Sequence, residues 1–381
     1  MITDGLKTWI ELSRKNLRRN LGVFRRLCGE ATPIWIVKAN AYGHGAALIA
    51  REIDKTIKRG RGEWFGVDSI DEGIALRKEG IRAPIIVLGW VPYPRLSELV
   101  KNNLRYLVSS ERTVKELAKL KNKKGLRAHL KIDTGATRQG VLPAGALKLA
   151  KSIKSAGMTL EGVATHFANI EDVDNPTYAD LQLERFTATV ALLRRNGFSV
   201  PIVHAACTAA IMTRLETIFT AARVGIGLYG LNPSALIKNA FRKRHRGLEL
   251  SPVLSWRSRV ALVKSAAAGT PVGYGLTERV KKDSTIAVIP VGYADGYDRS
   301  LSSRGAVLVR GRRARVIGRI CMNMFMIDVT GIRGVKENDV VTLIGEDRGK
   351  KLSADDLSGL SDTIAYEIVA RLPAGIKRLV V

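Results

Sequence analysis

The stretch Ile34–Gly45, IWIVKANAYGHG, places a single lysine, Lys38, at the end of a short apolar run that continues into a glycine-containing loop. A short apolar run with such a boundary is typical of a buried strand, so we predict a strand with one amine at its tip. Burial in apolar surroundings disfavours an ammonium ion, and a buried lysine therefore suits Schiff-base chemistry with a carbonyl compound. A lysine that merely flanks a core strand would show the same pattern, and position alone leaves both interpretations open.

Seven further segments of this kind follow, separated by amphipathic stretches with helical periodicity. This alternation is the pattern of repeated βα units. Eight parallel strands with intervening helices, over about 200 residues, fit a closed (β/α)8 TIM-type barrel better than an open sheet. The eight predicted strands are Ile34–Lys38, Trp64–Asp68, Pro84–Leu88, Arg105–Val108, Arg127–Ile132, Leu160–Thr165, Pro201–Ala205 and Ala221–Ile226.

The alternation of predicted strands and helices ends at a polar, basic stretch from Lys238 to Pro252. This stretch is the candidate linker between two domains. We therefore predict an α/β protein with a barrel domain at residues 1–244 and a mainly β domain at residues 245–381. Ser353, followed three residues later by Asp356, indicates a helix start, and Ile364–Leu372 indicates a second helix. The predicted strands of this domain are Trp256–Lys264, Thr285–Val291, Ala306–Val309, Phe325–Val329 and Val340–Ile344.

The composition fits an intracellular protein of two domains. The chain has 381 residues, 46% of them hydrophobic, which exceeds the size at which a single core usually stops growing. The sequence contains no apolar signal segment and no stretch of membrane-spanning length, so we expect a cytoplasmic protein without a membrane partner. The cysteines Cys28, Cys207 and Cys321 have no paired spacing, so neither a disulfide framework nor a metal site is indicated.

The charge is strongly positive: 62 lysines and arginines against 35 acidic residues give a formal net charge of +27. Such an excess is compatible with a nucleic-acid surface or with solvated loops. No recognition motif or aromatic platform accompanies the basic clusters, so we expect nonspecific, salt-sensitive polyanion binding at most. The clusters are Lys121 with Lys123 and Lys124, Arg242–Arg246, and Arg310–Arg319.

Polar residues gather where the predicted barrel strands end. Active sites of such barrels lie at the carboxyl ends of the strands, often with a phosphate site after the last two. The peptide N–H groups of Gly225 and Ile226, with the hydroxyl of Thr208, suit a phosphate at that position. The candidates at this mouth are Lys38, Lys131, Asp133, Arg138, His166, Cys207, Thr208, Arg223 and Gly225.

Several separated motifs, in order along almost the whole chain, resemble those of the alanine racemases. They are VKANAYGHG, KIDTGATRQG, THFAN, HAACTAA, RVGIGLYG, VGYG, GYADGY, RICMNM and IAYEI. The resemblance implies a homodimeric isomerase that depends on pyridoxal 5′-phosphate and interconverts L- and D-alanine, supplying D-alanine for peptidoglycan. Alternatives are a broad-spectrum amino-acid racemase, a basic amino-acid decarboxylase of the same architecture, or a polyanion-binding or cofactor-carrier protein without turnover.

The resemblance also implies roles for individual barrel residues. Lys38 would carry the cofactor, and Arg138 would meet the cofactor's ring oxygen and the substrate carboxylate. Lys131 matches a lysine that is often carbamylated, a change that creates an anion able to orient Arg138. A permanently cationic Arg223 beside the pyridine nitrogen would leave the ring a weak electron sink, which favours racemisation over transamination and decarboxylation. The cofactor-binding residues would be Lys38, Tyr42, His166, Thr208, Arg223, Gly225, Ile226 and Tyr366.

The second domain would complete the active site of the partner subunit. Tyr274 matches a second catalytic base, which would exchange the α-proton of L-alanine while Lys38 exchanges that of D-alanine. A chain from Tyr274 through His166 to Arg223 would favour the phenolate. Asn323 stands where many relatives carry aspartate. The substrate pocket would be narrowed by Tyr293, Met322 and Asn323, so we expect a small substrate.

Overall fold

The computed structural model describes residues 3–57, 62–121, 123 and 125–381, so Lys124 of the first basic cluster lies outside the described residues. The chain forms two compact units. The barrel unit comprises Leu17–Ala41 and Ala46–Ser251, and the sheet unit comprises Met1–Asn16, Tyr42–Gly45 and Pro252–Val381. The domain boundary between residues 244 and 245 stays a prediction. The structure also shows that segments far apart in the sequence belong to the sheet unit.

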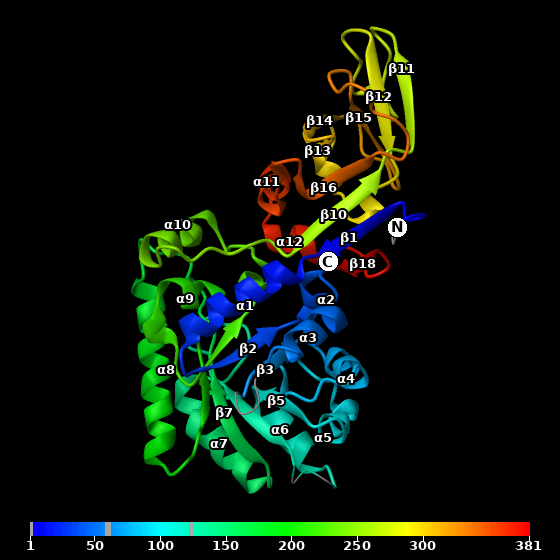
Figure 1. Cartoon of the computed structure of the whole chain (residues 1–381). Helices are drawn as coiled ribbons and strands as arrows, with labels where there is room; N and C mark the ends of the chain where they lie inside the picture. Colours follow the sequence, from blue (N-terminus) through cyan, green and yellow to red (C-terminus); the bar gives the residue numbers. More distant parts are fainter. Residues whose placement is uncertain (1–2, 58–61, 122, 124) are drawn as a thin grey trace. The chain divides into compact units, whose positions relative to one another are not determined.

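Eight parallel strands close into a barrel in sequence order, which confirms the predicted fold class (Figure 1). Most of their side chains are buried, as expected for parallel strands covered on both faces. Each strand lies within two residues of its predicted position. The strands are β2 Thr32–Ile36, β3 Trp64–Val67, β4 Ile85–Val87, β5 Leu104–Val108, β6 Arg127–Lys131, β7 Thr159–Ala164, β8 Ile202–His204 and β9 Ala221–Val224.

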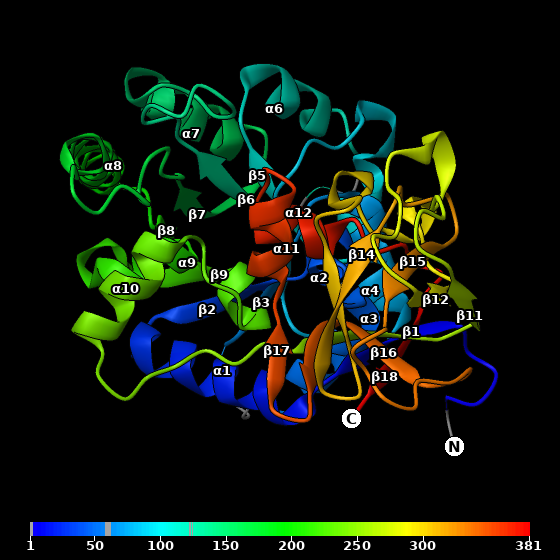
Figure 2. The ribbon, with the colours of Figure 1, turned by 90° about the horizontal axis from the view of Figure 1, so that it is seen from above.

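Helices alternate with the barrel strands, and most of them lie outside the barrel (Figure 2). Local caps fix several starts: Ser69 and Glu72 form a capping box at α4, and Ser110 caps α6. No described helix combines the length and hydropathy that a bilayer crossing demands. The helices are α1 Arg14–Cys28, α2 Lys38–Tyr42, α3 Ala46–Asp54, α4 Ile70–Lys78, α5 Ser97–Lys101, α6 Glu111–Ala118, α7 Ala146–Ser155, α8 Thr177–Arg195, α9 Thr208–Thr213 and α10 Ala235–Arg244.

The linker prediction was partly wrong, because the first part of Lys238–Pro252 belongs to α10. Ser234 caps this helix through the N–H of Ile237, and Phe241 packs into the core, so the basic residues occupy the exposed face of a regular helix. The cluster that ends the helix is also partly neutralised, since Arg242 lies 3.6 Å from Glu249.

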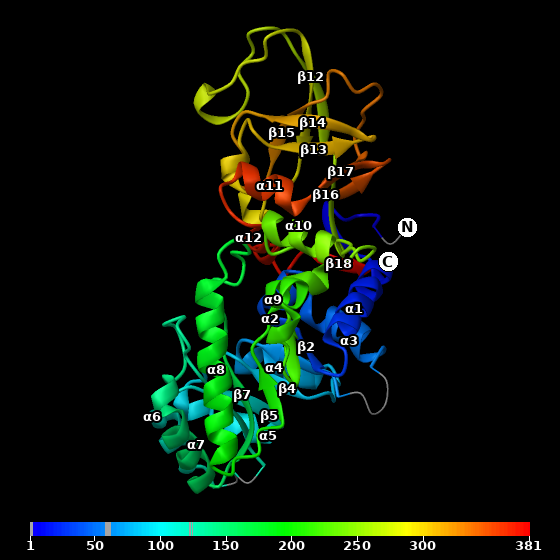
Figure 3. The ribbon, with the colours of Figure 1, turned by 90° about the vertical axis from the view of Figure 1, so that its left-hand side faces the viewer.

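The sheet unit is mainly β, as predicted (Figure 3). The segment predicted as one strand, Trp256–Lys264, forms two strands, and the basic cluster at Arg310–Arg319 contains a strand that the sequence analysis did not predict. The sheet order is β11-β12-β15-β14-β13-β16-β10-β1-β18, with β17 on β16. The strands are β1 Thr8–Leu12, β10 Leu254–Arg259, β11 Leu262–Ala266, β12 Ser284–Ile289, β13 Ala306–Val309, β14 Arg312–Ile317, β15 Phe325–Asp328, β16 Val340–Asp347, β17 Lys350–Leu352 and β18 Lys377–Val380.

Two short helices complete this unit, both near their predicted positions. Helix α11, Ala354–Leu360, begins with the expected capping box of Ser353 and Asp356, and α12 spans Ala365–Ala370. Tyr297, an ordinary core aromatic, is 1% exposed and stacks on Phe325 with ring centroids 4.5 Å apart.

The loop Tyr42–Gly45 belongs to the sheet unit because α12 and Arg378 hold it. Arg378 donates to the Gly43 carbonyl from Nε at 2.9 Å and from Nη2 at 2.7 Å. Gly43 has a φ of +79°, and a Cβ at this position would lie 1.8 Å from the Val369 carbonyl oxygen. Only glycine fits there, which explains the first glycine of the YGHG motif.

Replacing Gly43 with Ala should therefore destabilise the sheet unit more than the same replacement at Gly349, a glycine with nearly the same φ. Gly349 has a φ of +80° with nothing within 4 Å of its built Cβ, so Gly349→Ala incurs only the backbone cost of about 1–2 kcal/mol. Gly43→Ala adds an overpacking cost of about 1–3 kcal/mol. Equilibrium unfolding in urea measures both variants. Equal shifts in the two midpoints would contradict the close contact with α12.

Candidate active site

Lys38 begins a left-handed turn instead of ending a strand. Residues Ala39–Tyr42 have φ values between 51° and 55°, a region that non-glycine residues seldom adopt. Two side chains hold the turn: Glu72 accepts the Ala39 N–H at 2.6 Å, and Asn40 accepts the Ala46 N–H at 3.0 Å. The lysine is thus placed by a strained but well-bonded segment at the carboxyl end of β2.

The apolar environment predicted for Lys38 was wrong. Its side chain is 40% exposed, and its Nζ lies 3.5 Å from Oδ1 of Asp68, directly after β3. Asp68 follows a neighbouring strand, so a carboxylate of the barrel mouth faces the amine where the sequence suggested only apolar residues. The amine is accessible, as a group that reacts with a carbonyl compound has to be.

Lys131 and Arg138 are joined by a tight loop after β6. Oδ1 of Asp133 accepts the N–H groups of Gly135, Ala136 and Thr137 at 2.9, 2.9 and 3.1 Å, which shapes the loop. Burial, with the nearby cations Arg223 and Arg138, holds the pKa of Lys131 well below its ordinary value. Lys131 is therefore a buried amine whose uncharged form is favoured more than that of an ordinary lysine.

Arg223, on β9, is a cation 7% exposed among strand ends. Its terminal nitrogens donate to the carbonyls of Thr165 and Ala205 at 2.7 Å and of His204 at 2.8 Å, and to His204 Nδ1 at 2.6 Å. Burial lowers its pKa to about 10, so it remains charged at neutral pH. No described residue accepts the Nε–H, which leaves one donor for an acceptor in the mouth.

His166 lies beside this cation, with its Nδ1 3.3 Å from Arg223 Nη2. Burial first, then the charges of Arg223 and Lys131, holds its pKa well below the ordinary histidine value. The imidazole is therefore neutral, accepts at Nδ1 and carries its proton on Nε2. The predicted contact between His166 and Arg223 is present in the barrel unit.

Thr208 lies at the start of α9, next to the turn that follows β9. Its Oγ1 accepts the N–H groups of Gly225 at 2.9 Å and of Gly227 at 3.4 Å, so its own hydroxyl proton is left to donate elsewhere. A Cβ on Gly227 would lie 2.7 Å from Thr208, so glycine is needed for this approach. The predicted phosphate residues Thr208, Gly225 and Ile226 are thus brought together at a helix start and turn.

Two histidines at this site were not predicted to take part in it. His129 and His204, both fully buried, are joined by a 2.9 Å contact between Nδ1 of His129 and Nε2 of His204. A sequence signal was available, because His129 and Lys131 are two residues apart on one strand and so share a face of the barrel wall. The sequence analysis assigned neither histidine a role in the site.

The predicted residues of the sheet unit also gather. The N–H groups of Tyr293 and Ala294 donate to the carbonyls of Cys321 at 3.1 Å and Met322 at 3.0 Å, which joins the GYADGY and RICMNM loops. A Cβ on Gly275, which follows Tyr274, would lie 2.8 Å from the Arg319 side chain. Their apolar side chains are largely exposed: Tyr274 at 70%, Leu276 at 61%, Tyr293 at 42%, Met322 at 56% and Met324 at 47%.

Tyr42 and Tyr366, both predicted to support the cofactor, lie side by side in the sheet unit. Their ring centroids are 6.1 Å apart. The contact follows from the attachment of Tyr42–Gly45 to α12, the helix that carries Tyr366.

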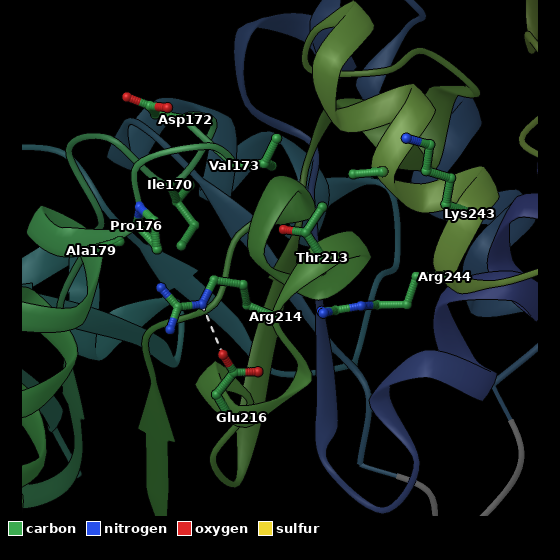
Figure 4. A pocket seen from close by; sticks show the side chains of 11 residues that line it. Ile170, Asp172, Val173, Pro176, Ala179, Thr213, Arg214, Glu216, Lys243 and Arg244 are labelled. Carbon is green, nitrogen blue, oxygen red and sulfur yellow. Dashed lines mark hydrogen bonds and ion pairs between the residues drawn. The ribbon is translucent and has the colours of Figure 1, made fainter.

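A separate pocket of about 590 Å³ opens beside α8, α9 and α10 in the barrel unit (Figure 4). Its charges are mixed, and Arg214 donates from Nε to Glu216 at 2.8 Å. No predicted site residue lines it, and we assign it no role. Its walls are Ile170, Asp172, Val173, Pro176, Ala179, Thr213, Arg214, Glu216, Ala240, Lys243 and Arg244.

Comparisons with known proteins find the same family over nearly the whole chain. Residues 12–233 match the family model "Alanine racemase, N-terminal domain", and residues 253–380 match "Alanine racemase, C-terminal domain". An alanine racemase of Leptospira interrogans is 37% identical over 99% of this chain and 97% of its own, and one of Symbiobacterium thermophilum is 38% identical over 99% and 98%.

Solved structures agree as well. An alanine racemase of Clostridium difficile matches with a TM-score of 0.91 at 31% identity, over 99% of this chain and 96% of that one. The alanine racemase of Bacillus anthracis with bound L-Ala-P matches with a TM-score of 0.89 at 31% identity, over 98% and 95%.

Replacing Thr208 with Val should destabilise the barrel unit, because two peptide N–H groups lose their acceptor while the side-chain shape is kept. We expect a loss of about 1–3 kcal/mol in the free energy of unfolding. Thr208→Ser keeps the oxygen and is the control, with a loss below about 1 kcal/mol. Thermal unfolding of both variants measures the difference. If valine were as stable as serine, the Thr208 oxygen would not be holding the turn.

Proposed function

The chain belongs to the alanine racemase family, and we propose that it racemises alanine with pyridoxal 5′-phosphate on Lys38 and with Lys38 and Tyr274 as two bases. As a family member it is an isomerase with the family's barrel. The proposal is carried by Arg223, a buried cation at the barrel mouth whose Nε–H has no acceptor among the described residues. We further propose that the D-alanine serves peptidoglycan synthesis.

The residues present suit the cofactor. When bound, pyridoxal phosphate makes the α-proton of an attached amino acid acidic. Lys38 would hold it covalently through its accessible amine, and the Nε–H of Arg223 would donate to the ring nitrogen. Because an arginine gives up no proton at neutral pH, that nitrogen would stay unprotonated. Phosphate contacts are assigned to Thr208, Gly225, Ile226 and Tyr366, with Tyr42 and His166 completing the site.

The two bases would act on opposite faces of the substrate. Lys38 would exchange the α-proton of D-alanine, and Tyr274 of the partner subunit that of L-alanine. A tyrosine has an ordinary pKa near 10, so its phenolate needs local support. Neutral His166, in contact with Arg223, supports this assignment as the neighbour through which the cation would favour the phenolate.

We also propose that Lys131 is carbamylated, on the basis of the family resemblance and of its lowered pKa. The uncharged form of the amine, which the lowered pKa of Lys131 favours, attacks carbon dioxide, forms a C–N bond and loses a proton, which turns a potential cation into an anion. That anion would lie near Arg138 and Arg223, both cations that act on the pKa of Lys131. It would orient Arg138 toward the substrate carboxylate.

A homodimer with shared active sites is supported by the exposed apolar side chains of the sheet unit. Tyr274, Tyr293 and Met322 lie on adjoining loops with 42–70% of their area exposed. Gathered apolar groups of this kind are typical of interaction surfaces. We propose that these loops, with Asn323, enter the active site of the partner.

Substrate breadth separates this proposal from its nearest rival, a broad-spectrum racemase. Several methylenes of lysine or arginine would need room where the rings of Tyr293 and Tyr366 are proposed to act. Asn323 also lacks the charge that would attract a distal ammonium. A decarboxylase would call for a protonated ring nitrogen, against which Arg223 argues.

The two bases can be tested with isotopes. Tyr274→Phe keeps the ring but deletes the proton carrier, so solvent deuterium should enter L-alanine at least a hundredfold more slowly while its entry into D-alanine is much less affected. Proton NMR of each enantiomer in deuterium oxide follows the α-proton. An equal loss for both enantiomers would contradict the assignment of one base to each face.

The shared site can be tested by complementation. Lys38→Ala and Tyr274→Phe are each expected to be inactive, but a mixed dimer restores one complete site of two. Mixing equal amounts should recover up to about a quarter of the normal activity per chain, because half of the dimers are mixed when subunits exchange freely. Sites built within single chains predict no recovery. Mass spectrometry of differently tagged chains verifies the exchange.

A further inference from the structure

Four polar side chains of the barrel unit, beginning with Arg223, are joined by consecutive hydrogen bonds, and we call this row the hydrogen-bond file. Nη1 of Arg223 lies 2.6 Å from Nδ1 of His204, and Nε2 of His204 lies 2.9 Å from Nδ1 of His129. Nε2 of His129 lies 3.2 Å from Oε2 of Glu161. Both imidazoles are fully buried, and the glutamate side chain is 15% exposed. The members of the file lie on β9, β8, β6 and β7, which are four consecutive strands of the closed barrel.

The ends of the file fix the direction of every hydrogen bond in it. Arginine can only donate, so His204 accepts at Nδ1 and carries its proton on Nε2. That proton is donated to Nδ1 of His129, whose own proton must then be on Nε2, facing the acceptor-only carboxylate of Glu161. Burial is the main reason that the pKa values of both histidines are lowered, so both rings stay neutral.

Packing holds the members of the file in place. A Cβ on Gly162 would lie 2.6 Å from Nδ1 of His129, so glycine beside Glu161 leaves room for the ring. At the far end, Glu161 lies 3.3 Å from Nε of Arg105 and 3.6 Å from Nε of Arg127. The hydrogen bond from His129 and the charge of Arg105 hold the pKa of Glu161 below its ordinary value despite burial. The acceptor that ends the file is therefore a fixed anion.

We propose that His204, His129 and Glu161 are positioning residues that align the guanidinium of Arg223 for the cofactor's ring nitrogen. This rests on the proposed function. The carbonyls of Thr165, His204 and Ala205 hold the terminal nitrogens. Two side chains also accept from them, His204 Nδ1 at 2.6 Å and, more distantly, His166 Nδ1 at 3.3 Å. The acceptor on His204 is available only in the tautomer that Glu161 imposes through His129. Bonds in such a file polarise one another, so the carboxylate also partly compensates the distant cation.

The test is Glu161→Leu, which removes the terminal acceptor, with Glu161→Gln as the conservative variant that keeps an oxygen for His129. In protein labelled with ¹⁵N at histidine, the unmodified chain should show both rings as neutral tautomers protonated at Nε2 between pH 6 and 9. Glu161→Leu should convert a substantial part of His129 and His204 to the other tautomer, and Glu161→Gln should restore the original signals. Unchanged histidine tautomers in Glu161→Leu would show that Glu161 does not set the direction of the hydrogen bonds in the file, and the proposal would fall.

Kinetics and spectra of the holoenzyme give the second readout. We expect Glu161→Leu to lower kcat for alanine at least fivefold with KM changed less than twofold, and to shift the absorption band of the bound cofactor. Glu161→Gln should recover most of kcat. A kcat unchanged in Glu161→Leu would overturn the positioning role. If the unmodified protein failed to racemise alanine while its tautomers were fixed as described, the proposed function would fail and the hydrogen-bond file would stand.

Glu63→Leu is the matched control for loss of a buried carboxylate. Glu63 is 1% exposed, accepts from Arg25 at 2.8 Å and from Trp35 at 2.9 Å, and directly precedes β3. It has no contact with the file, so its removal should lower stability without changing the histidine tautomers or the kcat of the folded protein. The same changes in both leucine variants would mean that general destabilisation causes the effect, and the proposal would fall.

Discussion

The need to satisfy a buried cation, Arg223, organises the carboxyl ends of the barrel strands. Removing such an ion from water costs several kcal/mol unless hydrogen bonds replace its hydration. Here carbonyls at the ends of β7 and β8 supply that replacement, so the segments that carry His166 and Thr208 are held at a fixed distance from β9. A cofactor site built on such a frame is preorganised, because its polar groups are already aligned by bonds the protein needs for its own stability.

Backbone strain adds a second constraint at the same mouth. A left-handed turn of non-glycine residues at Ala39–Tyr42 costs about 1–2 kcal/mol per residue. The side chains of Glu72 and Asn40 oppose this cost within the barrel unit. Strain of this kind persists only where the surroundings determine the backbone completely, and it commonly marks a functional segment. In this chain it directly follows Lys38.

Much of the fold could be predicted because buried parallel strands and amphipathic helices have distinct local patterns. What local patterns lack is knowledge of distant neighbours. The exposure of Lys38 was missed because its partner, Asp68, comes from the next strand of the barrel. Strand β14 was read as a basic cluster, although Arg313 and Arg315 alternate with Ala314 and Val316, because charge hid the period of two.

The candidate site, like the fold, could be predicted from the sequence only in part. Residues at strand ends were found from the barrel rule, and the motifs gave Tyr42 and Tyr366, whose contact the structure shows. The file of His204, His129 and Glu161 escaped prediction, since it depends on which interior side chains face one another across three strands. A histidine inside a barrel strand gives no local sign that its neighbour is a second histidine.

The position of β1 has a consequence for synthesis on the ribosome. Its strand partners are β10 and β18, with Leu12 opposite Leu254 and Val380, whereas all barrel strands lie between residues 32 and 224. At about 5–20 residues per second, the nascent chain carries β1 without a partner for about 10–50 s while the barrel strands emerge. An unpaired strand is a site for wrong pairing, so β1 stays open to it until β10 and β18 emerge.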